Sequence, residues 1–131
     1  MTPLVADYQA RISKFHPIED VVLRPVKNDR LLTRFDKELR ESDISIAMDE
    51  RGRQYDSVGF SSLVSKWMNQ GTRQVTFLIG GADGLPEPIK RHSNQLMALS
   101  KMTLPHRLAR LLLSEQLYRA LTIIRGTPYQ K

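Results

Sequence analysis

The sequence lacks several features on which whole classes of protein depend. It contains no cysteine, which excludes disulfide frameworks, zinc ribbons and thiol nucleophiles. No hydrophobic run approaches the roughly 20 residues that a membrane helix needs. Asp7 and Arg11 interrupt the region where a signal peptide would have its apolar core. We therefore expect a cytoplasmic protein without a membrane segment.

The familiar motifs of metal, nucleotide and hydrolase sites are also missing. The three histidines His16, His92 and His106 show no metal-ligand spacing, so we expect no metal. The run FLIGGADGLP at 77–86 has its glycines as G-G-x-x-G, unlike a dinucleotide fingerprint, and it lacks the lysine and hydroxyl of a P-loop. The pair Ser61–Ser62 does not fit a nucleophile elbow. A phosphate cradle and a hydrolase site are both disfavoured.

Acidic residues are scarce in the last third of the chain. Residues 90–131 carry eight lysines and arginines against the single acid Glu115, whereas residues 1–89 carry 12 basic and 13 acidic side chains. The net charge of +6 therefore belongs to the C-terminal third. Such an excess is typical of a solvated helix face or of a surface that binds a polyanion. Composition leaves RNA, DNA and acidic proteins open as partners.

Hydrophobic periodicity and capping residues predict alternating strands and helices. We expect helices over about 2–15, 28–42, 57–70, 86–93 and 105–125, and strands over about 19–26, 43–49, 74–80 and 95–100. The segment DERG at 49–52 is predicted to turn the chain, and the strand QVTFLIG at 74–80 is apolar enough for burial on both faces. This order predicts one α/β domain over residues 1–131 with a largely parallel sheet.

Three predicted strand ends have sequences that suggest a ligand site. They are Met48, the pair Gly80–Gly81, and Leu99 where it continues into SKMTLP. Ligands of parallel sheets bind at the carboxyl ends of the strands. Apolar strand ends with permissive backbone suit a ligand that is recognised through backbone groups and carries no phosphate. S-adenosylmethionine, with its adenosine, sulfonium and amino-acid groups, fits that description.

The stretches FLIGGADGL, LSKMTLPHRLARLLLSEQLYRAL and GTPYQK closely resemble the ribosomal RNA large subunit methyltransferase H family. The resemblance covers nearly the whole chain. It implies a SPOUT-type α/β fold: an open, mostly parallel sheet with a C-terminal trefoil knot, here lacking the family's usual first strand. It also implies a homodimer that binds S-adenosylmethionine in the knot and methylates N3 of a pseudouridine in 23S rRNA of the assembled ribosome.

The resemblance implies roles for individual residues. The cofactor site is expected to be lined by Met48, Gly80, Leu99, Ser100, Lys101, Met102, Thr103 and Leu104. The residues expected to contact RNA are His106, Arg107, Arg110, Arg125, Tyr129 and Lys131. Tyr129 and Arg110 are the candidate catalytic residues. The chain departs from the family at Gln130, where a histidine is usual.

The C-terminal helix and tail carry two further expectations. The helix is apolar on more than one side, through Leu108, Leu111, Leu112, Leu117, Leu121 and Ile124. A helix of this kind is buried on two faces, which agrees with a core side and a dimer side. Beyond Gly126, Pro128 prevents further helix, so we expect Tyr129 on a short extended arm. The resemblance implies that its ring stacks on the target base; without the resemblance, a disordered terminus would be the expectation.

Two other functions remain open at this point. One is an RNA- or ribosome-binding module that kept the fold and lost the chemistry. The other is a SPOUT methyltransferase that acts on another RNA, such as tRNA. Transfer of a labelled methyl group to ribosomes distinguishes these possibilities from the first.

Overall fold

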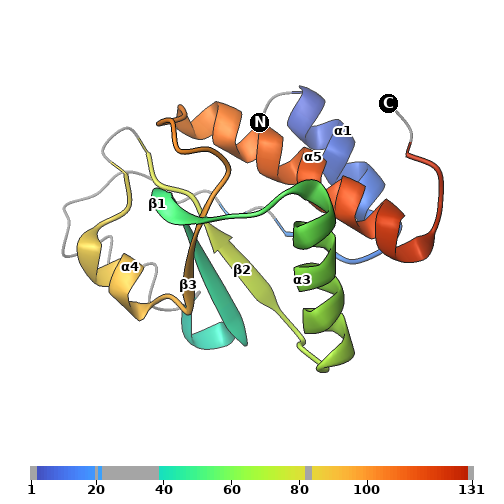
Figure 1. The fold of residues 1–131 in the computed structure, drawn as a ribbon, viewed down its shortest axis with the longest axis horizontal. Coiled ribbons are helices and arrows are strands. Elements are labelled where there is room, and N and C mark those ends of the chain that lie inside the picture. Colours follow the sequence, from blue (N-terminus) through green and yellow to red (C-terminus); the bar gives the residue numbers. More distant parts are fainter. Residues whose placement is uncertain (1–2, 20, 22–38, 82–83, 130–131) are drawn as a thin grey trace. The chain divides into compact units, whose positions relative to one another are not determined.

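A computed structural model of the chain contains two compact units, each built from alternating segments of the sequence (Figure 1). It describes residues 3–19, 21, 39–81 and 84–129. The helical unit consists of Met1–Asp20, Tyr55–Gly71 and Arg107–Lys131. The sheet unit consists of Val21–Gln54 and Thr72–His106. The single domain remains a prediction from the sequence.

The sheet unit has three strands in its described part, all parallel. They are β1 (Ile44–Gln54), β2 (Val75–Leu78) and β3 (Gln95–Ala98), in the order β2-β1-β3. A core beside them consists of Ala47, Leu78, Leu85 and Ile89, with Leu39 and Leu96 packed against it. The predicted α/β class with a parallel sheet is confirmed, and the knot and the missing first strand stay predictions.

Strand β1 does not end where the sequence suggested. The predicted turn at 49–52 is wrong, because β1 continues to Gln54. Met48 and Arg53 both pair with Met97 of β3, so the residues between them are displaced from the ladder. Glycine at position 52 lets β1 come back to pair with β3. A Cβ there would lie only 2.5 Å from the backbone nitrogen of Met97, so a side chain would not fit. Close backbone approach of β3 therefore replaces the turn.

Strand β2 is less buried than its apolar sequence predicted. It lies at an edge of the described sheet, and of its four residues only Leu78 is buried. The expectation of burial on both faces is thus wrong for this strand. The predicted strand over 19–26 and most of the predicted helix over 28–42 fall outside the described residues; residues 39–41 are helical.

A short helix follows the glycine-rich turn after β2. Helix α4 (Glu87–His92) begins after Pro86, as the sequence predicted, and its residue Ile89 is fully buried. Because Ile89 belongs to the core of the sheet unit, α4 is fixed beside the strands.

The helical unit contains α1 (Pro3–Ser13), α3 (Ser57–Asn69) and α5 (His106–Arg125), whose first residue belongs to the sheet unit. The Asp56 side chain accepts a 2.6 Å hydrogen bond from the Gly59 backbone nitrogen at the start of α3. Gly71 and Gly126, at φ of 74° and 67°, follow the ends of α3 and α5. These boundaries agree with the sequence. None of the described helices combines the length and hydropathy that crossing a membrane requires.

Candidate functional site

The register of the sheet brings three of the predicted site segments to one edge. Ala47 pairs with Leu78 of β2, and Met48 pairs with Met97 of β3. The glycine turn begins shortly after Leu78, and the 99–104 loop shortly after Met97. Because the strands are parallel and β1 lies between the other two, Met48 of β1 and the carboxyl ends of β2 and β3 are neighbours.

The glycine turn is closed by its own backbone. The Gly84 backbone nitrogen donates a 3.0 Å hydrogen bond to the Gly81 carbonyl oxygen, and Gly84 has a φ of 74°. A Cβ on Gly80 would lie 2.4 Å from the carbonyl carbon of Gly84 and 2.5 Å from the nitrogen of Leu85. A Cβ on Gly81 would meet nothing within 4 Å. Gly80 is therefore required by the turn itself, and the open space lies at Gly81.

The loop over residues 99–104 offers backbone groups and short polar side chains. Lys101, Met102 and Thr103 are exposed, Met102 to 75%. The backbone nitrogen of Met102 donates a 3.0 Å hydrogen bond to the Ser100 hydroxyl. The Thr103 hydroxyl donates to the Glu50 carboxylate at 3.4 Å. This loop is thus suited to recognising a ligand through its main chain.

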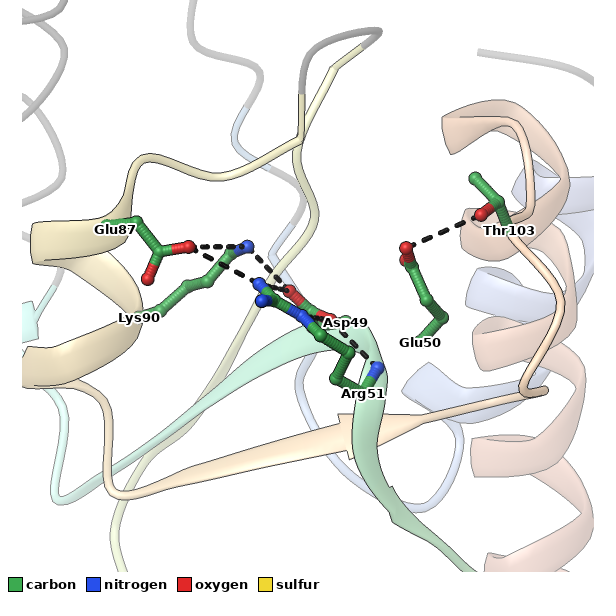
Figure 2. Close-up of polar contacts among 6 residues, drawn as sticks. All are labelled: Asp49, Glu50, Arg51, Glu87, Lys90 and Thr103. Carbon is green, nitrogen blue, oxygen red and sulfur yellow. Dashed lines mark hydrogen bonds and ion pairs between the residues drawn. The ribbon is translucent and has the colours of Figure 1, made fainter.

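A charged cluster joins Asp49 and Arg51 of β1 to Glu87 and Lys90 of α4 (Figure 2). Lys90 Nζ lies 2.6 Å from Asp49 Oδ2, and Arg51 Nε lies 3.2 Å from Asp49 Oδ1. Arg51 and Lys90 also contact Glu87 Oε1 at 3.3 and 3.5 Å. Hydrogen bonds from the Arg51 side chain, and then from Lys90, hold the pKa of the Asp49 carboxyl well below its usual range. We did not predict this cluster, because its members are distant in sequence.

The predicted RNA-binding side chains fall mainly on α5. His106 and Arg107 are exposed at its start, and Arg110 is half-buried. Arg125 is exposed at its end, with its guanidinium 5.8 Å from the ring centroid of Phe15. Lys131 lies outside the described residues.

Tyr129 packs back against α5. Its hydroxyl donates a 2.7 Å hydrogen bond to Glu115 Oε2 and lies 3.4 Å from the Tyr8 hydroxyl. Its ring lies 5.2 Å from that of Tyr118, and the Arg119 guanidinium carbon is 4.1 Å above it. The tail is therefore docked where a free extended arm was expected. Glu115 and Arg119 form an ion pair at 2.9 Å, which is part of this cluster.

A hollow of about 530 Å³ lies between α3 and α5 in the helical unit. It is lined by Ser61, Ser62, Ser65, Lys66, Asn69, Gln70, Ile123 and Ile124. None of the predicted site residues lines it. Within the described ranges, no three histidine, aspartate or glutamate side chains converge to hold a metal ion.

Comparisons with known proteins agree with the family resemblance noted in the sequence. The model of a family described as "Predicted SPOUT methyltransferase" matches residues 1–130. A ribosomal RNA large subunit methyltransferase H of Anaeromyxobacter sp. (strain Fw109-5) is 54% identical over 86 residues, 66% of this chain and 56% of the relative. The protein of that name from Syntrophotalea carbinolica is 40% identical over 133 residues, 95% of this chain and 85% of the relative. The one from Streptococcus pyogenes serotype M12 is 37% identical over 140 residues, 97% and 88% of the two chains.

Proposed function

This chain belongs to the SPOUT methyltransferase family, and we propose that it transfers a methyl group from S-adenosylmethionine to N3 of a pseudouridine in 23S rRNA of the assembled ribosome. The observation that carries the proposal is the 40% identity to a ribosomal RNA large subunit methyltransferase H across 95% of the chain. The choice of pseudouridine, of its N3 atom and of the cytoplasmic ribosome follows from the resemblance of the SKMTLPH and EQLYRA segments.

The proposed cofactor site lies where β2 and β3 end beside Met48 of β1. S-adenosylmethionine supplies a methyl group already activated on its sulfonium. The open space beside Gly81 and the exposed residues Lys101 to Thr103 of the loop at 99–104 fit a ligand that is held through main-chain groups. Met48, Gly80 and residues Leu99 to Leu104 would hold it there.

The contribution of the protein is mainly to orient the reactants and exclude water, because the methyl donor needs no covalent help. The N3 atom of the base must lose a proton. Burial, together with hydrogen bonds to Tyr8 and Glu115, raises the pKa of the Tyr129 phenol. A phenol with a raised pKa stays protonated at neutral pH, so the docked Tyr129 acts as a hydrogen-bond donor and not as the base.

RNA binding is proposed for the basic side chains of α5. His106 and Arg107 are exposed, and exposed cations contribute by neutralising phosphates and releasing counterions. These contacts position the enzyme on RNA without reading the sequence. Arg110 and Arg125 extend the same basic helix, and Lys131 follows it in sequence.

We also propose that the protein is a homodimer that uses one side of α5. Large apolar side chains on this helix remain exposed: Leu108 to 42%, Leu112 to 36% and Ile123 to 44%. Exposed apolar patches on a helix mark an interaction surface, and a second copy of the same chain is the commonest occupant of such a surface.

The test is methyl transfer from labelled S-adenosylmethionine to intact ribosomes, free 23S rRNA and tRNA. We expect label in ribosomes and little in the other two. A methyl group on N3 blocks Watson–Crick pairing, so the modified position is located as a stop in reverse transcription. Label in tRNA alone favours a different RNA substrate, and tight cofactor binding without transfer to any of the three favours a binding module.

A further inference from the structure

The carboxylate of Asp49 is buried where β1, after Met48, is displaced from its pairing with β3. It directly follows Met48, and only 6% of its side chain is exposed. It accepts hydrogen bonds from the Arg51 backbone nitrogen at 2.8 Å and from Arg51 Nε at 3.2 Å, and Lys90 Nζ lies at 2.6 Å. Its oxygens are thus occupied by protein groups, so Asp49 is not a candidate for direct contact with a substrate.

Lys90 connects this strand end to the glycine turn. It lies on α4, which begins soon after the turn, and its side chain is 13% exposed. Its neighbour Ile89 is fully buried in the core beside Leu85. The position of Lys90 is therefore fixed by packing. Its ion pair with Asp49 in turn holds the Asp49 side chain in place (Figure 2).

Backbone pairing alone does not fix this part of β1 against β2 and α4. The ladder between β1 and β2 ends at the pair Ala47 and Leu78. The pairing with β3 shifts register after Met48. Side-chain contacts must hold the residues between Met48 and Arg53, and the buried Asp49–Lys90 pair is one such contact. The Glu50 carboxylate also accepts a 3.4 Å hydrogen bond from Thr103 of the loop over residues 99–104.

We propose that Asp49 and Lys90 are positioning residues of the cofactor site: their ion pair sets the part of β1 at Met48 against the turn at Gly80 and Gly81. This inference rests on the proposed function, because the pocket is the one assigned there. Arg51 and Glu87 have side chains 65% and 64% exposed, so water screens their contribution and the effect depends mainly on the buried pair.

If the Asp49–Lys90 pair only stabilised the fold, its substitution would have different consequences. Removing one member of a buried ion pair leaves the other charge uncompensated and destabilises the fold, whereas replacing both members is often close to neutral. A double substitution should therefore restore stability. If the pair positions the loops, the double substitution does not restore cofactor affinity.

The experiment measures melting temperature and affinity for S-adenosylhomocysteine in wild type, Asp49→Asn, Lys90→Met and the double variant. We expect both single variants to melt at lower temperature and the double variant to recover most of that loss. The double variant should still bind S-adenosylhomocysteine roughly tenfold more weakly or worse. With ribosomes, its KM for S-adenosylmethionine should rise while kcat at saturation changes little.

A matched control comes from the start of the same strand. Asp43 accepts a 2.6 Å hydrogen bond from the Arg73 backbone nitrogen and lies 3.5 Å from its guanidinium. The double variant Asp43→Asn with Arg73→Met removes an ion pair of the same sheet away from the proposed pocket, so its affinity should equal that of wild type.

Two outcomes overturn the inference. If the Asp49–Lys90 double variant binds S-adenosylhomocysteine like wild type, the pair has no positioning role, and the proposed function is untouched. If wild type itself binds neither S-adenosylmethionine nor S-adenosylhomocysteine, the proposed function fails as well. A second double variant, Asp49→Ser with Lys90→Leu, repeats the measurement should the first not fold.

Discussion

Gly80 and Gly81 are adjacent in sequence, yet an added methyl group meets different surroundings at each. At Gly80 it would overlap the backbone of Gly84 and Leu85, whereas at Gly81 it would enter open space. Gly80 is also expected to line the cofactor site, where a larger residue would fill space needed by the ligand. The close approach of the Gly84 and Leu85 backbone gives a second reason why substitution at this position should be harmful: residue 80 must be glycine so that the turn can close.

The two glycines are therefore expected to respond differently to substitution. Gly80→Ala should destabilise the protein by about 1–3 kcal/mol, because neighbouring backbone must move. Gly81→Ala should change stability by less than about 0.5 kcal/mol. Gly81→Val, which extends further into the open space, should weaken S-adenosylhomocysteine binding roughly tenfold. Denaturant unfolding and calorimetry check these values, and unchanged affinity in Gly81→Val would move the cofactor elsewhere.

The bounds of helices and strands could be predicted from the sequence where contacts between neighbouring residues determine them. Asp56 caps α3, and Gly71 and Gly126 have the positive φ that helix ends favour. The alternating side chains of Ile44 to Met48 correctly predicted a strand. The turn assigned to 49–52 failed because pairing between Arg53 and β3 depends on residues distant in sequence.

The candidate site also has a part that could be predicted from the sequence and a part that could not. The order of strands and glycines allowed three segments to be grouped, since parallel strands end at one edge. The ion pair of Asp49 and Lys90 and the docking of Tyr129 onto Glu115 could not be predicted. Each depends on contacts between residues distant in the sequence, which leave no periodic trace in it.

The docked tail leads to a prediction for the Tyr129 hydroxyl. Tyr129→Phe should lower the free energy of unfolding by about 1 kcal/mol, because the hydrogen bond to Glu115 is lost while Arg119 still pairs with that carboxylate. A double-mutant cycle with Glu115→Gln, followed by denaturant unfolding, isolates the interaction between the two side chains. A coupling energy near zero would mean that the tail is not held by this contact in solution.

Removal of the whole Tyr129 side chain tests its proposed part in methyl transfer. The proposed part requires the Tyr129 ring to exchange its contacts with Tyr118 and Arg119 for the target base. Tyr129→Ala should then lower methylation of ribosomes roughly tenfold or more, since stacking on a base is worth about 1–3 kcal/mol. Affinity for S-adenosylhomocysteine should change much less, because the proposed cofactor residues belong to the three strand ends. Unchanged turnover in Tyr129→Ala contradicts a role for the tail in catalysis.

For the molecule as a whole, charge and apolar surface are concentrated in the same part of the sequence. The net charge of +6 comes from the last third of the chain, which also contains α5 with its exposed Leu108 and Leu112. A basic helix with exposed leucines suits two partners of different chemistry. Cations bind phosphates, and the leucines favour removal from water.

A second copy of the chain should cover those leucines, and this can be tested by adding a charge there. Leu112→Glu should convert the dimer to a monomer in light scattering at micromolar concentration, because the interface would otherwise bury an unpaired carboxylate. Val58→Glu is the matched control: Val58 is 65% exposed on α3 of the same unit, so the variant should remain dimeric. Circular dichroism should show native helix content in both variants. A wild-type monomer at that concentration, or a dimer that survives Leu112→Glu, would place the interface elsewhere or remove it, and the exposed leucines would then require another partner.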